Sequence, residues 1–584
     1  MLLLSIAFLP VIASLYRALT ERGWAFTAPM VQHLTLVLAF LGAWLAAREN
    51  KLLRLASGEF WKDAKAKPWI EGTTAIVSAF VCGLLALATY DFVLLEKEDG
   101  NTISDLMLSW PLLLAMPLGF GSVGAYLAWK NELPPWRGWL GRGLSFAALI
   151  VGWFVGVEEG LLFGQPVGIL VGVLLLAGLM GAPLFVPLGG IPLLYFLSDE
   201  IPSMAVSIEM NRLATQPFLP AVPLFTLVGF LLTEGKAPER MLRCFRACFG
   251  WLPGGTAVIA TLLCAFFSVF TGGSGVTILA LGGLLFHALK SDGYTENFSL
   301  GLMTGSGSLG ILLPPALPLI LFGIAANVPI DELFLAGLLP GLVLITLVCL
   351  WGVRAGWGSK TVRTPFDSRE AGAALWSAKF ELLAPVLAVS ALFSGWATLM
   401  EASALTAVYI LITQTFIHRD VSLTGSLGPV LRNCTAVLGG ILIILCCAQG
   451  LSSYLVDAEI PMRVLESLRE SIDSPLAFLL CLNLFLIVVG CFLDIYSATF
   501  VVVPLILPLA EAYEIDAIHL GIIFVANLEL GYLTPPVGLN LFLASYRFER
   551  PLFSIVKATL PIFCILAVGV LVITYVPWLT QIFR

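Results

Sequence analysis

Long apolar runs, each approaching or reaching the length of a membrane-spanning helix, follow one another along almost the whole chain. A helix that crosses the hydrocarbon core needs about 20 predominantly apolar residues. Short polar stretches separate the first five runs, which cover residues 2–15, 28–46, 70–94, 107–129 and 143–157. The pattern predicts an all-α protein that crosses the membrane many times.

The pattern changes near residues 135–165, around the fifth run. A Pro-Pro-Trp-Arg linker at 134–137 precedes the fifth run, and later runs are longer and interrupted by glycine and proline. We therefore expect a first part over residues 1–135, a connecting transmembrane helix over 136–165 and a larger part over 166–584. The apolar run at 2–15 lacks the basic flank of a signal peptide, so we expect it to be a retained first helix.

Composition agrees with lipid as the main solvent. Of 584 residues, 59% are hydrophobic and only 12% charged, and the mean hydropathy is +0.96. A net charge of −7 gives no basic face for nucleic acid. The eleven cysteines form no Cys-x-x-Cys pair, and none of the four histidines lies beside a cysteine pair, so we expect inert thiols and no transition-metal site.

Basic residues indicate the orientation, because cytoplasmic loops carry an excess of Lys and Arg. The loop after the second run is rich in them, the loop after the third is acidic, and the loop after the fourth is basic again. This alternation predicts a cytoplasmic amino terminus, although Arg17 and Arg22 then fall on the outer side. The fifth run would exit to Glu158 and Glu159.

The larger part repeats itself. The segment LGILLPP at 309–315 recurs as LGYLTPP at 530–536, an offset of 221 residues, and Pro238 and Arg240 match Pro461 and Arg463 at an offset of 223. Such duplication is typical of secondary transporters, and we expect one repeat at about 166–355 and the other at about 380–584. The first interrupted run ends in basic residues and the second in acidic ones, which predicts inverted repeats.

Four interruptions lie inside apolar segments, where an unpaired backbone group is costly. Two form tip-like breaks, at Gly272–Gly275 and around Asp494, and predict re-entrant helical hairpins. The other two are the proline pairs, where the helix must unwind. Unwound carbonyls together with Ser and Thr hydroxyls can cage a hard cation such as Na⁺. Alternatively, each break is only a kink or a close-packing point.

Asp494 lies in an apolar run, and an intramembrane carboxylate is a functional-site candidate by default. Two roles are open for this carboxylate: it binds or gates ions, or it forms only a structural hydrogen bond. Glu529 and Glu401 leave the same alternatives open.

At these residues the chain resembles the tripartite ATP-independent periplasmic (TRAP) transporters, with small and large membrane subunits fused. Residues 305–315 with 331–341, and residues 527–540, look like large-subunit signatures, and residues 40–43 and 47–49 look like part of the small subunit's second helix. The resemblance implies a four-helix small-subunit part, a large part with scaffold and transport domains, and an elevator mechanism. It also implies sodium-coupled secondary active uptake of an organic acid across the bacterial inner membrane, with delivery by a periplasmic substrate-binding protein.

The resemblance also implies site residues. One sodium site would use Thr271, Gly272, Gly273, Ser274, Ser306, Ser308 and Gly310, and a second would use Asp494, Ser497, Thr499, Gly531 and Thr534. Substrate would lie between the tips, near Ser274, Thr277, Pro314, Tyr496, Pro535 and Asn540. The chain has Thr271-Gly272-Gly273 where the family often has Ser-Gly-Ser, and Ala316 where serine often follows the first proline pair.

Two other function classes compete with this interpretation. A sodium–dicarboxylate symporter would work without a binding protein, but it would not need the additional amino-terminal helices. An intramembrane enzyme could use Ser306 or Ser308, but no histidine lies in a clear mid-membrane run to act as a base. No His-Glu-x-x-His or Walker A sequence is present. We therefore expect a transporter and not an enzyme.

Overall fold

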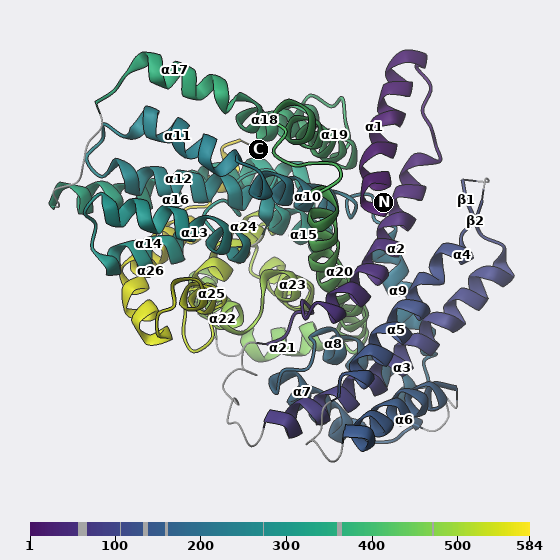
Figure 1. Ribbon diagram of the computed structural model, residues 1–584. Coiled ribbons are helices and arrows are strands. Elements are labelled where there is room, and N and C mark those ends of the chain that lie inside the picture. Colours follow the sequence, from purple (N-terminus) through teal and green to yellow (C-terminus); the bar gives the residue numbers. More distant parts are fainter. Residues whose placement is uncertain are drawn as a thin grey trace. The chain divides into compact units, whose positions relative to one another are not determined.

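The computed structural model describes residues 1–55, 67–104, 107–131, 138–157, 162–272, 274–358, 365–469, 472 and 474–583 (Figure 1). The expected linker at 134–137, Glu158, Glu159 and Gly273 lie outside these residues. The chain divides into two compact units: one comprises Met1–Pro223, Leu431–Val464 and Phe500–Leu505, and the other Leu224–Val430, Leu465–Thr499 and Ile506–Arg584.

Helices dominate both units. In the described part of the chain, eleven helices are long and apolar enough to cross a membrane, and a twelfth span exists if one pair bent by 61° counts as a single span. The prediction of an all-α protein with many membrane spans is confirmed.

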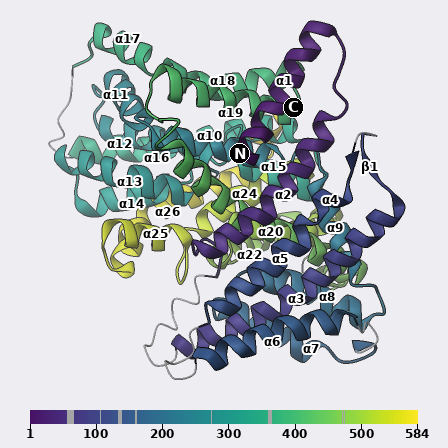
Figure 2. The ribbon, with the colours of Figure 1, turned by 45° about the vertical axis from the view of Figure 1, so that its right-hand side comes forward.

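The first unit begins with a helical bundle in which α3, α5 and α6 lie side by side (Figure 2). Its elements are α1 (Leu2–Thr20), α2 (Thr27–Arg48), α3 (Lys67–Asp99), β1 (Thr102–Ile103), β2 (Met107–Leu108), α4 (Trp110–Leu113), α5 (Ala115–Trp129) and α6 (Gly138–Val157).

Two details of this bundle differ from the sequence prediction. Helix α3 continues to Asp99, five residues beyond the apolar run expected to end at residue 94 and into the acidic loop, because Glu and Lys are good helix formers where the helix emerges into water. Met107 belongs to β2 and not to a helix, since β1 and β2 satisfy each other's backbone groups between α3 and α4.

Glycines let α3 and α6 pack with their backbones in close contact. A Cβ on Gly83 would lie 2.1 Å from the Leu149 carbonyl oxygen, and one on Gly152 would lie 2.2 Å from that of Phe80. Small residues at helix crossings are the usual means of packing in lipid, where apolar burial drives no association between helices.

Helix α2 crosses α20 (Leu427–Asp457) in the same way. A Cβ on Gly439 would lie only 1.8 Å from the backbone carbon of Gly42. At the end of this crossing Arg432 Nε lies 2.6 Å from Glu49 Oε1. Lys51 lies 2.7 Å from the other carboxylate oxygen, and these two cations, Lys51 first, hold the pKa of Glu49 below its ordinary value. Residues more than 380 positions apart thus form one interface.

The remaining helices are divided between the two units. The first unit also contains α7 (Gly168–Leu179), α8 (Phe185–Ser198) and α9 (Met204–Ala214), whereas α10 (Ala221–Glu234), α20, α21 (Ile460–Arg469) and α23 (Ile495–Ala512) have residues in both units. The second unit contains α11 (Ala237–Phe249), α12 (Gly255–Thr271), α13 (Ser274–Ser291), α14 (Glu296–Ser306), α15 (Leu317–Ala326), α16 (Ile330–Gly358), α17 (Ser368–Ser377), α18 (Lys379–Phe393), α19 (Leu399–Ile412), the π-helical turn η3 (Thr413–Ile417), α22 (Pro475–Phe492), α24 (Ala517–Gly531), α25 (Leu539–Phe548), α26 (Leu552–Tyr575) and α27 (Trp578–Gln581).

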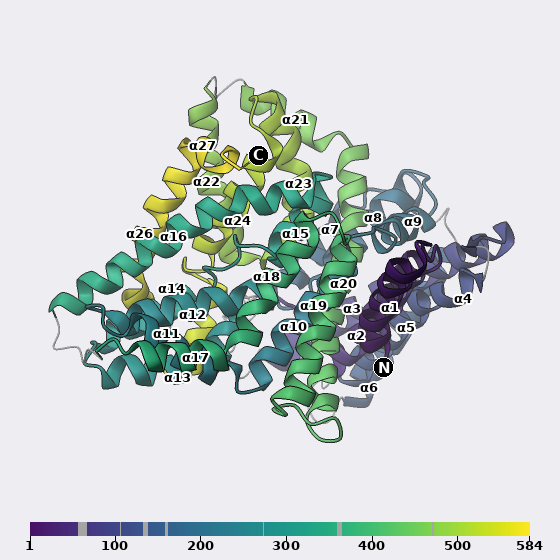
Figure 3. The same cartoon turned by 90° about the horizontal axis from the view of Figure 1, so that it is seen from above.

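Helix bounds follow the repeat offset. Shifted by 221 residues, α13 takes the bounds of α23, and α12, α14 and α15 begin within one residue of α22, α24 and α25. The N-caps also correspond, because Thr295 and Asp516 each accept a backbone hydrogen bond from the helix that follows. In the second unit α12 packs on α14 as α22 packs on α24, and α16 packs against α12, α24 and α26 (Figure 3).

A charged cluster ties α11 to the segment around η3 in the second unit. Arg240 donates from Nε to Glu381 Oε1 at 2.9 Å and from Nη1 to Asp420 Oδ2 at 2.7 Å. Gln414 donates to the same Glu381 oxygen at 3.2 Å, and Glu381 has no exposed surface. A buried carboxylate needs such a partner, because the charge has lost its water.

Replacing Arg240 with Gln should therefore destabilise the protein by about 3–5 kcal/mol, because it leaves Glu381 buried without its cation. Arg243→Gln is the matched control on the same helix, because its partner Glu370 is 46% exposed and that ion pair faces water. Thermal unfolding in detergent should show a large drop for Arg240→Gln and little change for Arg243→Gln. Equal melting temperatures for the two variants would contradict this role.

Candidate ion and substrate site

The first tip joins α12 to α13, which pack against each other. Gly272 has φ +62° and its N–H donates to the Ser268 carbonyl, so the helix ends there in a left-handed turn that favours glycine. A Cβ at this position would also lie 2.3 Å from Leu317 Cδ1. Beside the turn the hydroxyls of Thr271 and Thr277 lie 3.2 Å apart. The apolar run is therefore broken at the position where the sequence predicts a tip.

The first proline-pair break lies between α14 and α15, and it rests on α12. Gly310 donates its N–H to Ser268 Oγ at 2.8 Å, and a Cβ on Gly310 would lie 2.0 Å from the Ala265 carbonyl oxygen. Ser306 and Ser308 are fully buried at this break. The first tip and the first break thus share one polar region.

The second tip separates α22 from α23. Leu493 and Asp494 are extended, and the Asp494 carboxylate caps α23 by accepting N–H bonds from Tyr496 and Ser497 at 3.0 and 3.2 Å. Ser497 Oγ donates to the other carboxylate oxygen at 2.6 Å. Thr499 Oγ1 donates to the carbonyl oxygen four residues earlier. Asp494 therefore holds the start of a helix as an N-cap.

The second break packs on the second tip. Gly538 donates its N–H to the Cys491 carbonyl at 3.0 Å, and Cys491 Sγ donates to the Thr534 carbonyl at 3.2 Å. Gly531 lies so close to Gly490 that a Cβ on it would be 2.5 Å from the Gly490 Cα. Each tip is thus matched with the break of its own repeat.

Hydrogen bonds between tips and breaks join the two repeats in the second unit. Ser308 donates to Glu529 Oε1 at 3.3 Å, and these residues are 221 positions apart, which is the repeat offset. Equivalent residues of two copies can touch only near the axis that relates the copies. Asn540 Nδ2 donates to Ser308 Oγ at 3.4 Å, and Tyr496 Oη donates to the Gly272 carbonyl at 2.9 Å.

Three buried oxygen atoms around this contact have no hydrogen-bond partner among the described residues: Ser306 Oγ, Glu529 Oε2 and Asn540 Oδ1. Glu529 is 1% exposed and forms no ion pair with a described residue. A buried acceptor left without a donor costs about 1–3 kcal/mol, and more if it is charged. A group of such acceptors can instead bind a cation.

The amino-acid sequence matches the models of two known protein families. Residues 170–579 match the model of the DctM component of the tripartite ATP-independent periplasmic transporters, and residues 6–130 match that of their DctQ component. The first match covers well over half of the chain. The chain belongs to the TRAP transporter family.

Individual TRAP relatives agree. The C4-dicarboxylate large permease protein DctM of Vibrio cholerae is 31% identical over 431 residues, which cover 70% of this chain and 95% of that protein. The isethionate permease protein DctMQ of Oleidesulfovibrio alaskensis is 29% identical over 427 residues, which cover 72% of this chain and 64% of that protein. The sialic acid permease protein SiaT of Haemophilus influenzae is 27% identical over 358 residues, which cover 61% of this chain and 58% of that protein.

Both TRAP membrane components thus lie in one chain, as the sequence predicts, with the small-subunit match first and the large-subunit match second. The protein is a multi-pass membrane transporter and not an enzyme, because its relatives are transporter permeases.

The predicted site residues divide into those that the structure places at the tips and breaks and those that it describes only in part. Thr271, Gly272 and Thr277 lie at the first tip, and Ser306, Ser308 and Gly310 at the first break. Asp494, Tyr496, Ser497 and Thr499 lie at the second tip, and Gly531 and Thr534 at the second break. Gly273 lies outside the described residues, and nothing is described of the Ser274 side chain. Pro314 is buried and Pro535 is exposed. Their ion and substrate contacts stay predictions.

Sequence reasoning missed Ser268, Tyr532 and Cys491. Ser268 supports Gly310, while Tyr532 Oη accepts the Ile495 N–H and so joins the second break to the second tip. Ser268 and Cys491 lie in ordinary apolar helices outside the recurring segments, whereas Tyr532 lies inside LGYLTPP at a position where the first copy has Ile311. Position relative to the repeat is the one sequence signal that could have found them.

Glu401 has a local role. It forms a capping box with Thr398 at the start of α19: the Glu401 N–H donates to Thr398 Oγ1 at 3.3 Å, and the Glu401 carboxylate accepts the Thr398 N–H at 2.9 Å. The capping box accounts for this intramembrane carboxylate by a structural hydrogen bond.

Proposed function

We propose that this chain takes up an organic acid across the bacterial inner membrane by sodium-coupled secondary active transport, with its amino terminus in the cytoplasm. A periplasmic substrate-binding protein delivers the substrate. The transport domain then carries substrate and Na⁺ across against a scaffold, in an elevator movement.

The observation that carries the sodium coupling is the group of buried oxygens at the meeting point of the two repeats. Ser306, Glu529 and Asn540 each present a buried oxygen atom without a hydrogen-bond partner among the described residues. Hard cations prefer oxygen ligands. A bound Na⁺ would therefore satisfy these unpaired oxygens in place of the missing hydrogen-bond donors. The first sodium ion would lie at Thr271, Gly272, Ser306, Ser308 and Gly310, beside Glu529 and Asn540, which both form hydrogen bonds with Ser308. The second would lie at Asp494, Ser497, Thr499, Gly531 and Thr534.

The substrate class rests on the relatives. Those named for C4-dicarboxylate, isethionate and sialic acid are named for organic acids. The start of α13 at the first tip favours an anionic group, because a helix start carries partial positive charge. The start of α23 is already capped by the Asp494 carboxylate, so an organic acid between the tips would be bound by the start of α13.

Proteoliposomes that contain the full chain test the proposal. Radiolabelled C4-dicarboxylate, isethionate and sialic acid are offered in turn, each with a periplasmic substrate-binding protein that binds it. Uptake of the substrate that is transported should require both the binding protein and an inward Na⁺ gradient, and it should fall to background when K⁺ replaces Na⁺. Full uptake without any binding protein would favour a sodium–dicarboxylate symporter. Full uptake without Na⁺ would contradict the coupling.

A further inference from the structure

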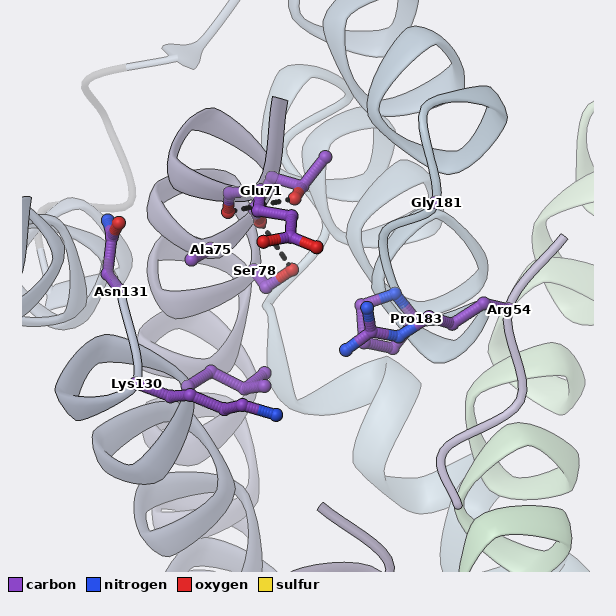
Figure 4. Close-up of a pocket in the computed structure, with 10 residues that line it drawn as sticks. Arg54, Glu71, Ala75, Ser78, Lys130, Asn131, Gly181 and Pro183 are labelled. Atoms are coloured by element: carbon purple, nitrogen blue, oxygen red, sulfur yellow. Dashed lines mark hydrogen bonds between the residues drawn. The ribbon is translucent and has the colours of Figure 1, made fainter. Parts of the chain in front are cut away.

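A polar cavity of about 170 Å³ lies in the first unit. Figure 4 shows Glu71 directed into it from α3, Arg54 facing Glu71 from the opposite side, and Lys130 between them on a third side. Pockets that enclose drug-sized molecules measure about 300–1,000 Å³. This cavity would therefore hold a small charged group rather than a whole organic substrate.

Several chain segments converge on the cavity at one end of the bundle. Helix α2 ends before it, α3 begins beside it, and α5 ends at it. The segment before α8 closes another side, since Leu184 donates its N–H to the Leu53 carbonyl at 3.0 Å and Arg54 pairs with Pro183. The cavity thus lies where residues of the DctQ match meet the start of the DctM match.

The lining carries two positive charges and one negative charge. Lys130 donates to Asn50 Oδ1, a neutral partner, and Glu71 lies 3.9 Å from Lys67 in an exposed pair. Asn131, which is 2% exposed, presents an Oδ1 atom without a hydrogen-bond partner. An anion beside the two cations would balance their charge, and a small ammonium group would compete with the exposed Lys67 for Glu71.

Tryptophans place this end of the bundle at headgroup depth. Trp69, Trp129 and Trp139 are 48%, 57% and 84% exposed. The Arg142 guanidinium lies 5.0 Å from the Trp129 ring centroid and 5.9 Å from that of Trp139. Exposed tryptophans of membrane proteins concentrate at the interface between lipid and water, and basic pockets between helices at that depth bind lipid headgroups.

We propose that this cavity binds the headgroup of an ethanolamine phospholipid, with the phosphodiester held by Arg54 and Lys130 and the primary ammonium by Glu71. The bound lipid joins the small-subunit part of the chain to the start of the large-subunit part. Free inorganic phosphate has the same anionic chemistry, but it lacks the ammonium group and the acyl chains that the surrounding apolar surface would contact.

Native mass spectrometry of the full chain in detergent tests this. Phosphatidylethanolamine, phosphatidylglycerol and phosphatidylcholine with identical acyl chains are titrated in turn. We expect phosphatidylethanolamine to bind most tightly, and the Arg54→Gln, Lys130→Gln double variant to lose about tenfold or more in affinity for it, which corresponds to about 1.4 kcal/mol. Glu71→Gln, whose side chain is largely exposed, should bind phosphatidylethanolamine no better than phosphatidylglycerol.

Arg48→Gln is the matched control, since Arg48 lies at the same end of the bundle over the Trp44 ring and does not line the cavity. It should bind all three lipids as the unaltered chain does. Unchanged phosphatidylethanolamine binding in the double variant would overturn the proposal. So would displacement of the lipid by millimolar inorganic phosphate, which would identify free phosphate as the ligand.

Discussion

Asp494→Asn is expected to lower sodium-driven uptake and to raise the Na⁺ concentration needed for half-maximal uptake by about tenfold or more, because a charged ligand is lost. Asparagine caps helices about as well as aspartate and can accept the same N–H bonds from Tyr496 and Ser497. The substitution therefore removes the charge while keeping the helix start. It separates the two roles that the sequence leaves open for Asp494.

The measurement is initial uptake by proteoliposomes over a series of Na⁺ concentrations, with the melting temperature recorded in parallel. Asp331→Asn is the control, since Asp331 is an exposed residue in the first turn of α16, outside the candidate site. If Asp494→Asn transported normally at limiting Na⁺, the residue would be a helix cap only. A collapse in stability together with uptake would mean that the carboxylate is needed for folding.

Gly439→Ala is expected to destabilise the protein by about 3 kcal/mol, at the upper end of the cost of overpacking. An added methyl group would lie 1.8 Å from the Gly42 backbone carbon, and neither backbone can move without separating α2 from α20. In an unobstructed helix the same change would stabilise by about 0.5–1 kcal/mol. The sign of the effect therefore tests whether this crossing exists.

Gly428→Ala provides the control on the same helix, because a Cβ there meets no atom within 4 Å. Fluorescence-detected size-exclusion chromatography after heating should show a lower melting temperature for Gly439→Ala and an equal or higher one for Gly428→Ala. Two variants that both melt like the unaltered chain would contradict the crossing. The result bears directly on how the small-subunit part is attached, since α2 lies in the DctQ match and α20 in the DctM match.

Backbone breaks were predictable because their causes are local. Gly272 can take φ +62° without strain, and each proline pair lacks the N–H groups that a continuing helix needs. The five early runs were predictable for the same kind of reason, since length and apolar content decide whether a segment can span lipid. Local pattern failed at Met107, where a two-residue ladder replaces the expected helix.

The side-chain partners were not predictable. Ser308 and Glu529 are both conspicuous in the sequence, but nothing local indicates that they touch across 221 residues. Arg54, Glu71 and Lys130 come from three segments of the first unit, and none stands out alone. Ser268 looks like an ordinary residue of an apolar helix until Gly310 is found to donate to it.

The sequence by itself determined that this protein lies in lipid, at which positions its helices are interrupted, and that its larger part is duplicated. These features were readable because hydropathy, glycine and proline act on the chain within a few residues. The tertiary structure alone decided which interruption faces which, that Asp494 caps a helix, and that three buried oxygens near Glu529 lack donors. These contacts depend on how distant segments fold back on one another, and the energy of an unpaired buried oxygen exists only once its surroundings have assembled.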